Sequence, residues 1–156
     1  MEINIREAGL NDLDRISNLG SKIREFEVSE DTRTFWPRKI LKKCINDPED
    51  ICLVAERKKK IIGFLIVNYN SNFKKAIIEN IFVMERYRRK GVGTELIKNL
   101  LQKLKKLKCE YIGSLVNLDN IKGIEFYGSV EFDRGRKFIL FNRRISETYN
   151  RKSEEK

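Results

Sequence analysis

Three consecutive stretches decide the fold: AIIENIFVM (residues 76–84), ERYRRKGVG (85–93) and TELIKNLLQKLKKLK (94–108). The first is apolar and rich in β-branched residues, which predicts a strand. The last repeats leucine at helical spacing with lysines between, which predicts an amphipathic helix from Gly93 to Lys108 with its lysines in water. A strand that leads through glycines into a helix presents free backbone N–H groups to an anion. We therefore predict a pyrophosphate site here.

The turn carries residues that suit a diphosphate. The first turn of a helix leaves its N–H groups unpaired, with about half a positive charge behind them. Gly91 and Gly93 lack the Cβ atoms that would keep phosphate oxygens away from the backbone. Arg88, Arg89 and Lys90 add positive charge around the same point.

Two other phosphate-binding motifs do not match. A nucleoside-triphosphate loop needs GxxxxGK followed by Ser or Thr, which the chain lacks. A dinucleotide-binding turn needs GxGxxG, whereas Leu96 stands at the third glycine position and residues 85–90 separate the strand from the glycine.

The spacing resembles that of the GNAT superfamily of N-acetyltransferases. The family core V-x-x-x-[YF]-[RQ]-x-x-G-x-G is matched by residues 83–93, and a later N-x-x-[AG]-x-x-[FL]-Y element by residues 120–127. Two positions depart from the family pattern. Gly128 stands where Glu or Lys is usual, and Glu131 stands where Gly is common.

The resemblance implies a fold, a domain plan and a reaction. The fold is α+β, with a mixed, mostly antiparallel central sheet of about six to seven strands flanked by about four helices. Residues 1–146 form one domain, and residues 147–156 form a flexible tail. The cofactor is acetyl-CoA, whose thioester is attacked directly by a primary amine. The dipeptide Glu79-Asn80 resembles the corresponding strand of spermidine/spermine acetyltransferases, so small amines and polyamines are candidate acceptors beside protein amines.

The resemblance also implies how the cofactor is held. The pyrophosphate lies on the N–H groups of residues 89–94, the pantetheine arm pairs with the backbone of residues 81–83, and the Val83 N–H polarises the thioester carbonyl. Asn120 bonds the pantetheine arm and can also cap a helix. The implied cofactor-binding residues are Ile81, Phe82, Val83, Arg88, Arg89, Lys90, Gly91, Val92, Gly93, Thr94, Asn120 and Tyr127.

Acetyl transfer needs a base for the amine and an acid for the departing thiolate, and the chain has no histidine. Strand alternation gives Glu79 three apolar neighbours on its side of the sheet: Ile77, Ile81 and Val83. Such surroundings raise a carboxyl pKa, so Glu79 is the candidate base, directly or through water. The alternative is an edge carboxylate paired with a lysine. The resemblance places Tyr127 beside the cofactor sulfur as the candidate acid, and the alternative is a core tyrosine bonded to backbone.

The remaining segments alternate between strand and helix patterns. Between residues 27 and 36 the pattern is lost, and Phe35 with Trp36 either lines a substrate pocket or fills the core. Further strands are predicted at residues 3–8, 51–56, 61–67, 110–116 and 138–145, with helices from a cap at Asn11 or Asp12 through Ile23 to Phe26, after Pro37, and after Asp119 or Asn120.

Composition leaves the partner open. The chain of 156 residues carries a net charge of +10 and 36% charged residues, which suits an anionic partner such as nucleic acid, an acidic membrane surface or a phosphorylated cofactor. A solvated Lys-rich surface explains the charge equally well. The alternative function is a non-catalytic acyl-CoA-binding or basic nucleic-acid-binding module, although the aromatic residues do not interleave with the basic runs, which disfavours nucleic acid.

Cysteine usage and the N-terminal pattern bear on location. Cys44, Cys52 and Cys109 show no CxxC spacing and are expected as free thiols, without a metal site, in a reducing cytoplasm. No secretion signal or membrane-length apolar run is present, so we expect a cytoplasmic protein without a membrane partner. The oligomeric state stays open, a homodimer included.

Overall fold

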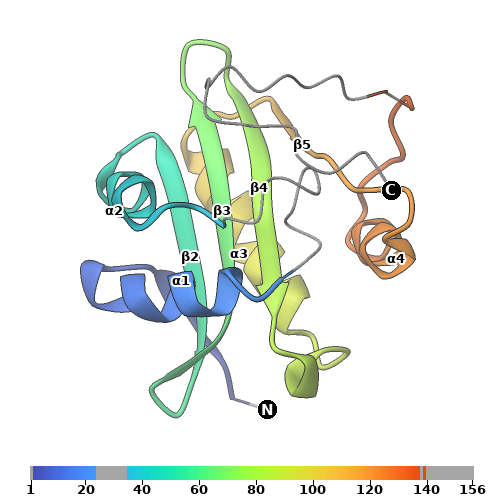
Figure 1. Cartoon of the computed structure of the whole chain (residues 1–156). Helices are drawn as coiled ribbons and strands as arrows, with labels where there is room; N and C mark the ends of the chain where they lie inside the picture. Colours follow the sequence, from blue (N-terminus) through green and yellow to red (C-terminus); the bar gives the residue numbers. More distant parts are fainter. Residues whose placement is uncertain (1, 24–34, 138, 140–156) are drawn as a thin grey trace, which may run out of the picture.

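The computed structural model describes residues 2–23, 35–137 and 139. These residues form one sheet with helices on both faces (Figure 1). The elements are β1 (Asn4–Glu7), η1 (Leu10–Asp12), α1 (Leu13–Gly20), α2 (Arg38–Asn46), β2 (Asp50–Arg57), β3 (Lys60–Asn70), β4 (Lys75–Val83), η3 (Glu85–Tyr87), α3 (Val92–Lys106), β5 (Tyr111–Ser114) and α4 (Ile121–Ser129), where η marks a short 3-10 helix.

The sheet has the order β1-β2-β3-β4-β5. The first four strands pair antiparallel, whereas β4 and β5 pair parallel, so the predicted mixed, mostly antiparallel α+β sheet is confirmed. The predicted count of six to seven strands is not matched, because the described residues contain five strands. The sixth predicted strand, at residues 138–145, lies outside the described residues except for Ile139, which is not part of a strand. The predicted tail lies outside them as well.

Two apolar layers sandwich the sheet. Helices α1 and α2 pack on one face around Ile16, Leu41 and Phe64, and α3 packs on the other around Leu65, Leu96 and other residues of its buried stripe. Figure 1 shows α1 and α2 in front of the strands and α3 behind them. The predicted amphipathic helix is present and has Leu96, Leu100 and Leu104 in the core, whereas Leu101 and Leu107 are exposed and the helix already ends at Lys106. The position of this helix fixes the turn that precedes it.

Helix α1 is shorter than the sequence pattern predicts. It ends at Gly20, so Ile23 lies beyond its end, and Phe26 lies outside the described residues. A Cβ atom at Gly20 would lie 2.3 Å from the ring of Phe35, which shows how closely the chain returns there. Phe35 and Trp36 are partly buried and pack against the layer under α1 and α2, which agrees with the core-filling alternative. Trp36 also lines a cavity, so the two alternatives do not exclude each other for this residue.

Asp12 does not cap α1 with its side chain. Its carboxylate accepts from the Arg6 guanidinium at 2.6 Å and from the Gly9 N–H at 2.8 Å. The bond from Arg6 holds the pKa of the Asp12 carboxyl below its usual range. Arg6 also contacts Glu56 at 2.8 Å, so one guanidinium joins β1, η1 and β2.

Strand β4 contains a β-bulge at Glu79. Adjacent residues of β3 pair with Ile78 and Asn80, so Glu79 between them has no partner. An inserted residue interrupts the alternation of side chains, and Ile78 and Ile81 both belong to the core under α3. The predicted shared side of Glu79 with its apolar neighbours is therefore wrong, since the bulge puts Ile77 on the opposite face from Ile81.

No helix in the described ranges is long and apolar enough to cross a membrane.

Candidate active site

The sheet parts between β4 and β5 at the candidate site. The register of the two strands ends with Ile78 opposite Ser114, while β4 continues to Val83. In Figure 1, β5 starts beside the first residues of β4 and then turns away toward α4. Among the described residues, no strand pairs with this edge of β4 from Glu79 onward.

The hydrogen-bond ladder decides which backbone groups face that open edge. The Met84 N–H donates to the Ile62 carbonyl at 2.9 Å, and pairing toward β3 then recurs at every second residue. The backbone N–H and C=O groups of Phe82 therefore point toward β3, whereas those of Ile81 and Val83 point away from β3. An extended ligand can pair with these groups as an added strand would.

The N-terminus of α3 lies just beyond this edge. Gly91 caps the helix in the left-handed conformation, with φ of 80°, and no atom lies within 4 Å of the place its Cβ would take. Among the residues that the structure describes, no side chain caps the helix, and the N–H groups of Val92, Gly93 and Thr94 have no capping partner there. Such a terminus binds anions through its free N–H groups and its dipole.

Gly93 has a role that the spacing alone does not reveal. A Cβ atom there would lie 2.8 Å from the ring of Phe126, which packs against the start of α3. This packing gives Gly93 a second reason to be glycine, and the predicted access for phosphate oxygens at Gly91 and Gly93 stays a prediction. The close approach brings α4, and with it Tyr127, to the same end of the sheet as the glycine turn.

The basic residues of the turn are exposed. Arg88 donates its Nε–H to the Val83 carbonyl at 2.9 Å, which ties the turn to the end of β4. Arg89 has a positive φ of 59°, and Lys90 follows it directly before the cap. Within the described part of the chain, none of the three forms an ion pair, so their charge is available to a bound anion.

Tyr127 reaches the point where the strands part. Its hydroxyl donates to Ser114 Oγ at 2.8 Å, and Ser114 Oγ in turn donates to the Ile78 carbonyl at 3.1 Å. Burial raises the pKa of Tyr127, and the bond to Ser114 acts in the opposite direction. The alternative of a tyrosine bonded to backbone is not found, because the partner is a side chain. Ser114 was not predicted, and a hydroxyl residue at the end of a short strand carries no sequence signal of this role.

Asn120 caps α4. Its Oδ1 accepts from the Gly123 N–H at 2.9 Å, and a Cβ at Gly123 would lie 2.7 Å from the Asn120 amide nitrogen. The predicted cap is confirmed, and the predicted bond to pantetheine stays a prediction.

Glu79 projects from the bulge as an exposed side chain. Desolvation and, secondarily, the charge of Asp50 raise its pKa above the usual carboxyl range. Because the side chain is exposed, water screens this effect. No lysine pairs with Glu79 among the described residues, so the alternative of an edge ion pair finds no support there.

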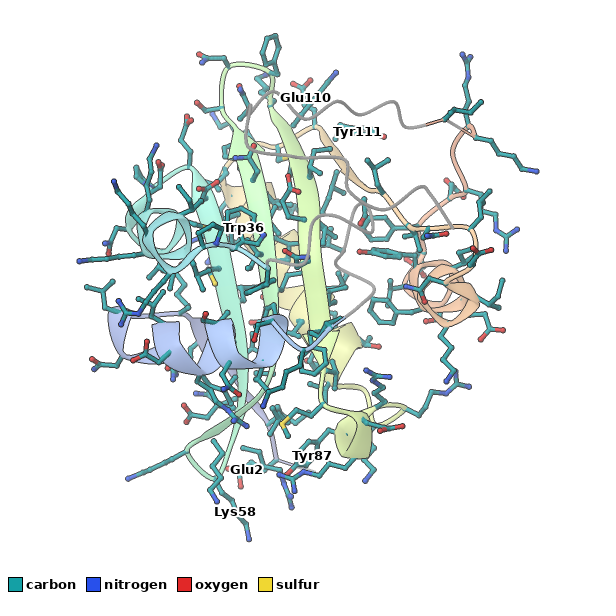
Figure 2. All side chains as sticks on the ribbon, viewed as in Figure 1. Glu2, Trp36, Lys58, Tyr87, Glu110 and Tyr111 are labelled. Carbon is teal, nitrogen blue, oxygen red and sulfur yellow. The ribbon has the colours of Figure 1, made fainter. Side chains whose placement is uncertain are left out.

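A cavity of about 350 Å³ lies on the face of the sheet that carries α2. Trp36 lines it, and Figure 2 shows this side chain lying over the sheet. The indole N–H donates to Oδ1 of the buried Asn80 at 2.7 Å, directly beside the bulge. Three acids also line the cavity: Asp47, Glu49 and Asp50.

Comparison with known proteins supplies the family. The model of the acetyltransferase (GNAT) family matches residues 17–132. The chain belongs to the GNAT family. An N-acetyltransferase of Methanocaldococcus jannaschii whose activity is uncharacterized is 32% identical over 83% of this GNAT chain and 60% of its own length. An N-alpha-acetyltransferase of Sulfurisphaera tokodaii is 26% identical over 84% of the chain and 80% of its own length.

A solved structure has the same fold. It is the aminoglycoside acetyltransferase AAC(6')-Iy in complex with a bisubstrate analog, CoA-S-monomethyl-acetylneamine. The TM-score is 0.76 at 16% identity, and the match covers 92% of the present chain and 99% of the AAC(6')-Iy chain. The predicted family is confirmed, and the predicted acetyl-CoA-dependent enzyme class agrees with these proteins.

The candidate site residues of this GNAT chain, predicted and newly found, fall into two groups. The cofactor side comprises residues 81–83, 88–94, Ser114 and Tyr127, which the structure gathers where β4 and β5 part. The acceptor side comprises Glu79 and the cavity lined by Trp36 and the three acids. Sequence reasoning did not connect the cavity acids with Glu79, because they lie far from it along the chain.

Proposed function

We propose that the protein transfers an acetyl group from acetyl-CoA to a primary amine. The observation that carries the proposal is the open edge of β4, where the backbone groups of Ile81 and Val83 face away from β3 beside the N-terminus of α3. Family membership supports the same cofactor.

Each part of the cofactor has a matching part of the chain. The pyrophosphate would take the N–H groups after Gly91, with Arg89 and Lys90 supplying charge. The pantetheine amides would pair with Ile81 and Val83. The Val83 N–H would then donate to the thioester oxygen as negative charge develops on it, and such a donor is worth about 3 to 4 kcal/mol.

The reaction moves two protons. A neutral amine attacks the thioester carbon, the C–S bond breaks, and Tyr127 gives its hydroxyl proton to the departing thiolate. The extra proton on the amine nitrogen passes to Glu79 through water. The pKa of Glu79 is raised by desolvation, and a raised pKa makes a carboxylate a better proton acceptor.

The acceptor is proposed from the charge of the cavity. Three acids against one lysine, Lys43, give the cavity lining a net negative charge. This charge and the face of Trp36 favour an amine with further positive charge, because carboxylates and an aromatic face both attract cations. Small amines, polyamines, aminoglycosides and protein amines form the panel to test, since an aminoglycoside acetyltransferase and an N-alpha-acetyltransferase are among the similar proteins.

Binding is the first experiment. A thermal-shift titration compares acetyl-CoA with CoA, pantetheine and adenosine diphosphate. Acetyl-CoA at 100 times its Kd should add about 2.7 kcal/mol of stability, and each fragment should add less. No shift with acetyl-CoA would contradict the proposal.

Turnover is the second experiment. CoA release is measured with each amine of the panel. Release with at least one amine is expected. Binding without release from any of them would instead favour the non-catalytic acyl-CoA-binding module.

A further inference from the structure

One serine hydroxyl joins the candidate acid to the point where the sheet parts. Ser114 Oγ lies 2.8 Å from the Tyr127 hydroxyl and 3.1 Å from the Ile78 carbonyl oxygen. Ser114 is the last residue of β5 and stands opposite Ile78, the last paired residue of β4. The hydroxyl therefore has two acceptors within reach and one hydrogen to give.

We propose that Ser114 is a positioning residue that turns its hydrogen from the Ile78 carbonyl to the Tyr127 oxygen as Tyr127 gives up its proton. This inference rests on the proposed role of Tyr127 as the acid. The hydroxyl thereby makes Tyr127 a stronger proton donor without touching the cofactor itself.

The geometry allows this exchange without moving a heavy atom. A neutral phenol donates to Ser114, but an ionised phenol has no hydrogen and can only accept. Rotation about the Cβ–Oγ bond of Ser114 carries the hydrogen from one acceptor to the other. The new bond is charge-assisted and roughly twice as strong as the neutral bond that it replaces.

Within the described ranges, few other groups contact Tyr127. Its ring lies against Phe126 on α4 and Phe132 beyond it, with centroid distances of 5.5 and 5.3 Å. Among the described residues, Ser114 is the one hydrogen-bond partner of the hydroxyl, and burial and Ser114 are the influences on its pKa. No charged side chain of the described part competes with the serine.

The proton balance is complete. The O–H bond of Tyr127 breaks as the S–H bond of CoA forms, which leaves a phenolate that accepts from Ser114. After the products leave, solvent returns a proton to the phenolate, and Ser114 donates to Ile78 again.

The experiment measures the pKa of Tyr127 directly. The protein is labelled with fluorotyrosine, and fluorine NMR follows each tyrosine through a pH titration, with Tyr127→Phe assigning the signal. We expect the pKa of Tyr127 to rise in Ser114→Ala and to stay near the wild-type value in Ser114→Thr, which keeps the hydroxyl. An unchanged pKa in Ser114→Ala overturns the inference, whether or not the protein is active.

A second readout separates this inference from the proposed function. With the best amine of the panel, kcat of Ser114→Ala should fall roughly tenfold at neutral pH. The alkaline limb of the pH profile of kcat should move to higher pH in Ser114→Ala. An acid works only while protonated, and a higher pKa keeps Tyr127 protonated to a higher pH. In the Tyr127→Phe background, adding Ser114→Ala should not lower kcat any further. A shifted pKa with an unmoved limb would overturn the catalytic role of the pair while leaving acetyl-CoA binding intact.

Discussion

The cofactor side and the acceptor side are built in different ways. On the cofactor side, the groups proposed to hold acetyl-CoA are mostly backbone groups of consecutive residues, and their positions follow from one strand, one turn and one helix. On the acceptor side, Trp36, Asp50 and Glu79 come from three separate segments and meet only in the folded chain. A contiguous motif can therefore identify a cofactor, whereas an acceptor is chosen by side chains that no local motif records.

The largest effect should come from the acid on the cofactor side. Tyr127→Phe removes the hydroxyl that donates to Ser114 and should lower kcat roughly 10²- to 10⁴-fold. The Kd for acetyl-CoA should stay nearly unchanged, because the phenol acts on the thiolate. Steady-state kinetics and calorimetry check both values. The matched control is Tyr111→Phe, at an exposed tyrosine of β5, the strand that carries Ser114. Equal losses in the two variants would remove Tyr127 from the mechanism.

The next largest effect should come from the glycine turn. Gly91→Val forces a β-branched residue into φ of 80°, a strain of about 1–3 kcal/mol. If the turn relaxes, the first N–H groups of α3 no longer point toward the pyrophosphate, and the Kd for acetyl-CoA should rise roughly tenfold to a hundredfold. Gly135→Val serves as the control, since a Cβ there meets no atom within 4 Å and its φ is not positive. A wild-type Kd in Gly91→Val would argue against the pyrophosphate site.

A smaller effect should separate the two sides. Trp36→Phe removes the donor to the buried Oδ1 of Asn80 and should destabilise the protein by about 1–3 kcal/mol, seen as a lower Tm. The Kd for acetyl-CoA should not change. Trp36→Phe/Asn80→Leu removes both partners and should recover much of the loss. A large change in acetyl-CoA affinity would show that the two sides are coupled.

The smallest effect concerns pH. As the proposed base, Glu79 would act only when deprotonated, so activity should fall as pH drops through its raised pKa. Asp50→Asn removes a negative charge that raises this pKa, so the acid limb of kcat should move to lower pH by less than about one unit. Asp47→Asn, at another acid of the same cavity, should leave the limb in place. If the acid limb of kcat does not move in Asp50→Asn, the group that titrates is not Glu79.

Much of the cofactor side was predictable from sequence, because strand, glycine turn and helix are local patterns. The strands β2, β3 and β5 followed from periodicity, whereas the family followed from the resemblance of two motifs, at residues 83–93 and 120–127, to the GNAT pattern. The bulge at Glu79 was not predictable, because it depends on how β3 pairs with β4. Two further contacts were missed for the same reason: Phe126 on Gly93 and Tyr127 on Ser114 join elements that are distant in sequence.

The central claim is that acetyl-CoA pairs with the open edge of β4 and with the start of α3. Amide hydrogen exchange measured by NMR tests it residue by residue, with and without acetyl-CoA. We predict new protection at Ile81, Val83 and residues 92–94. Phe82 should show little change beyond any general stabilisation, because its N–H already faces β3. Protection elsewhere, or an equal gain at Phe82 and Val83, would contradict the account.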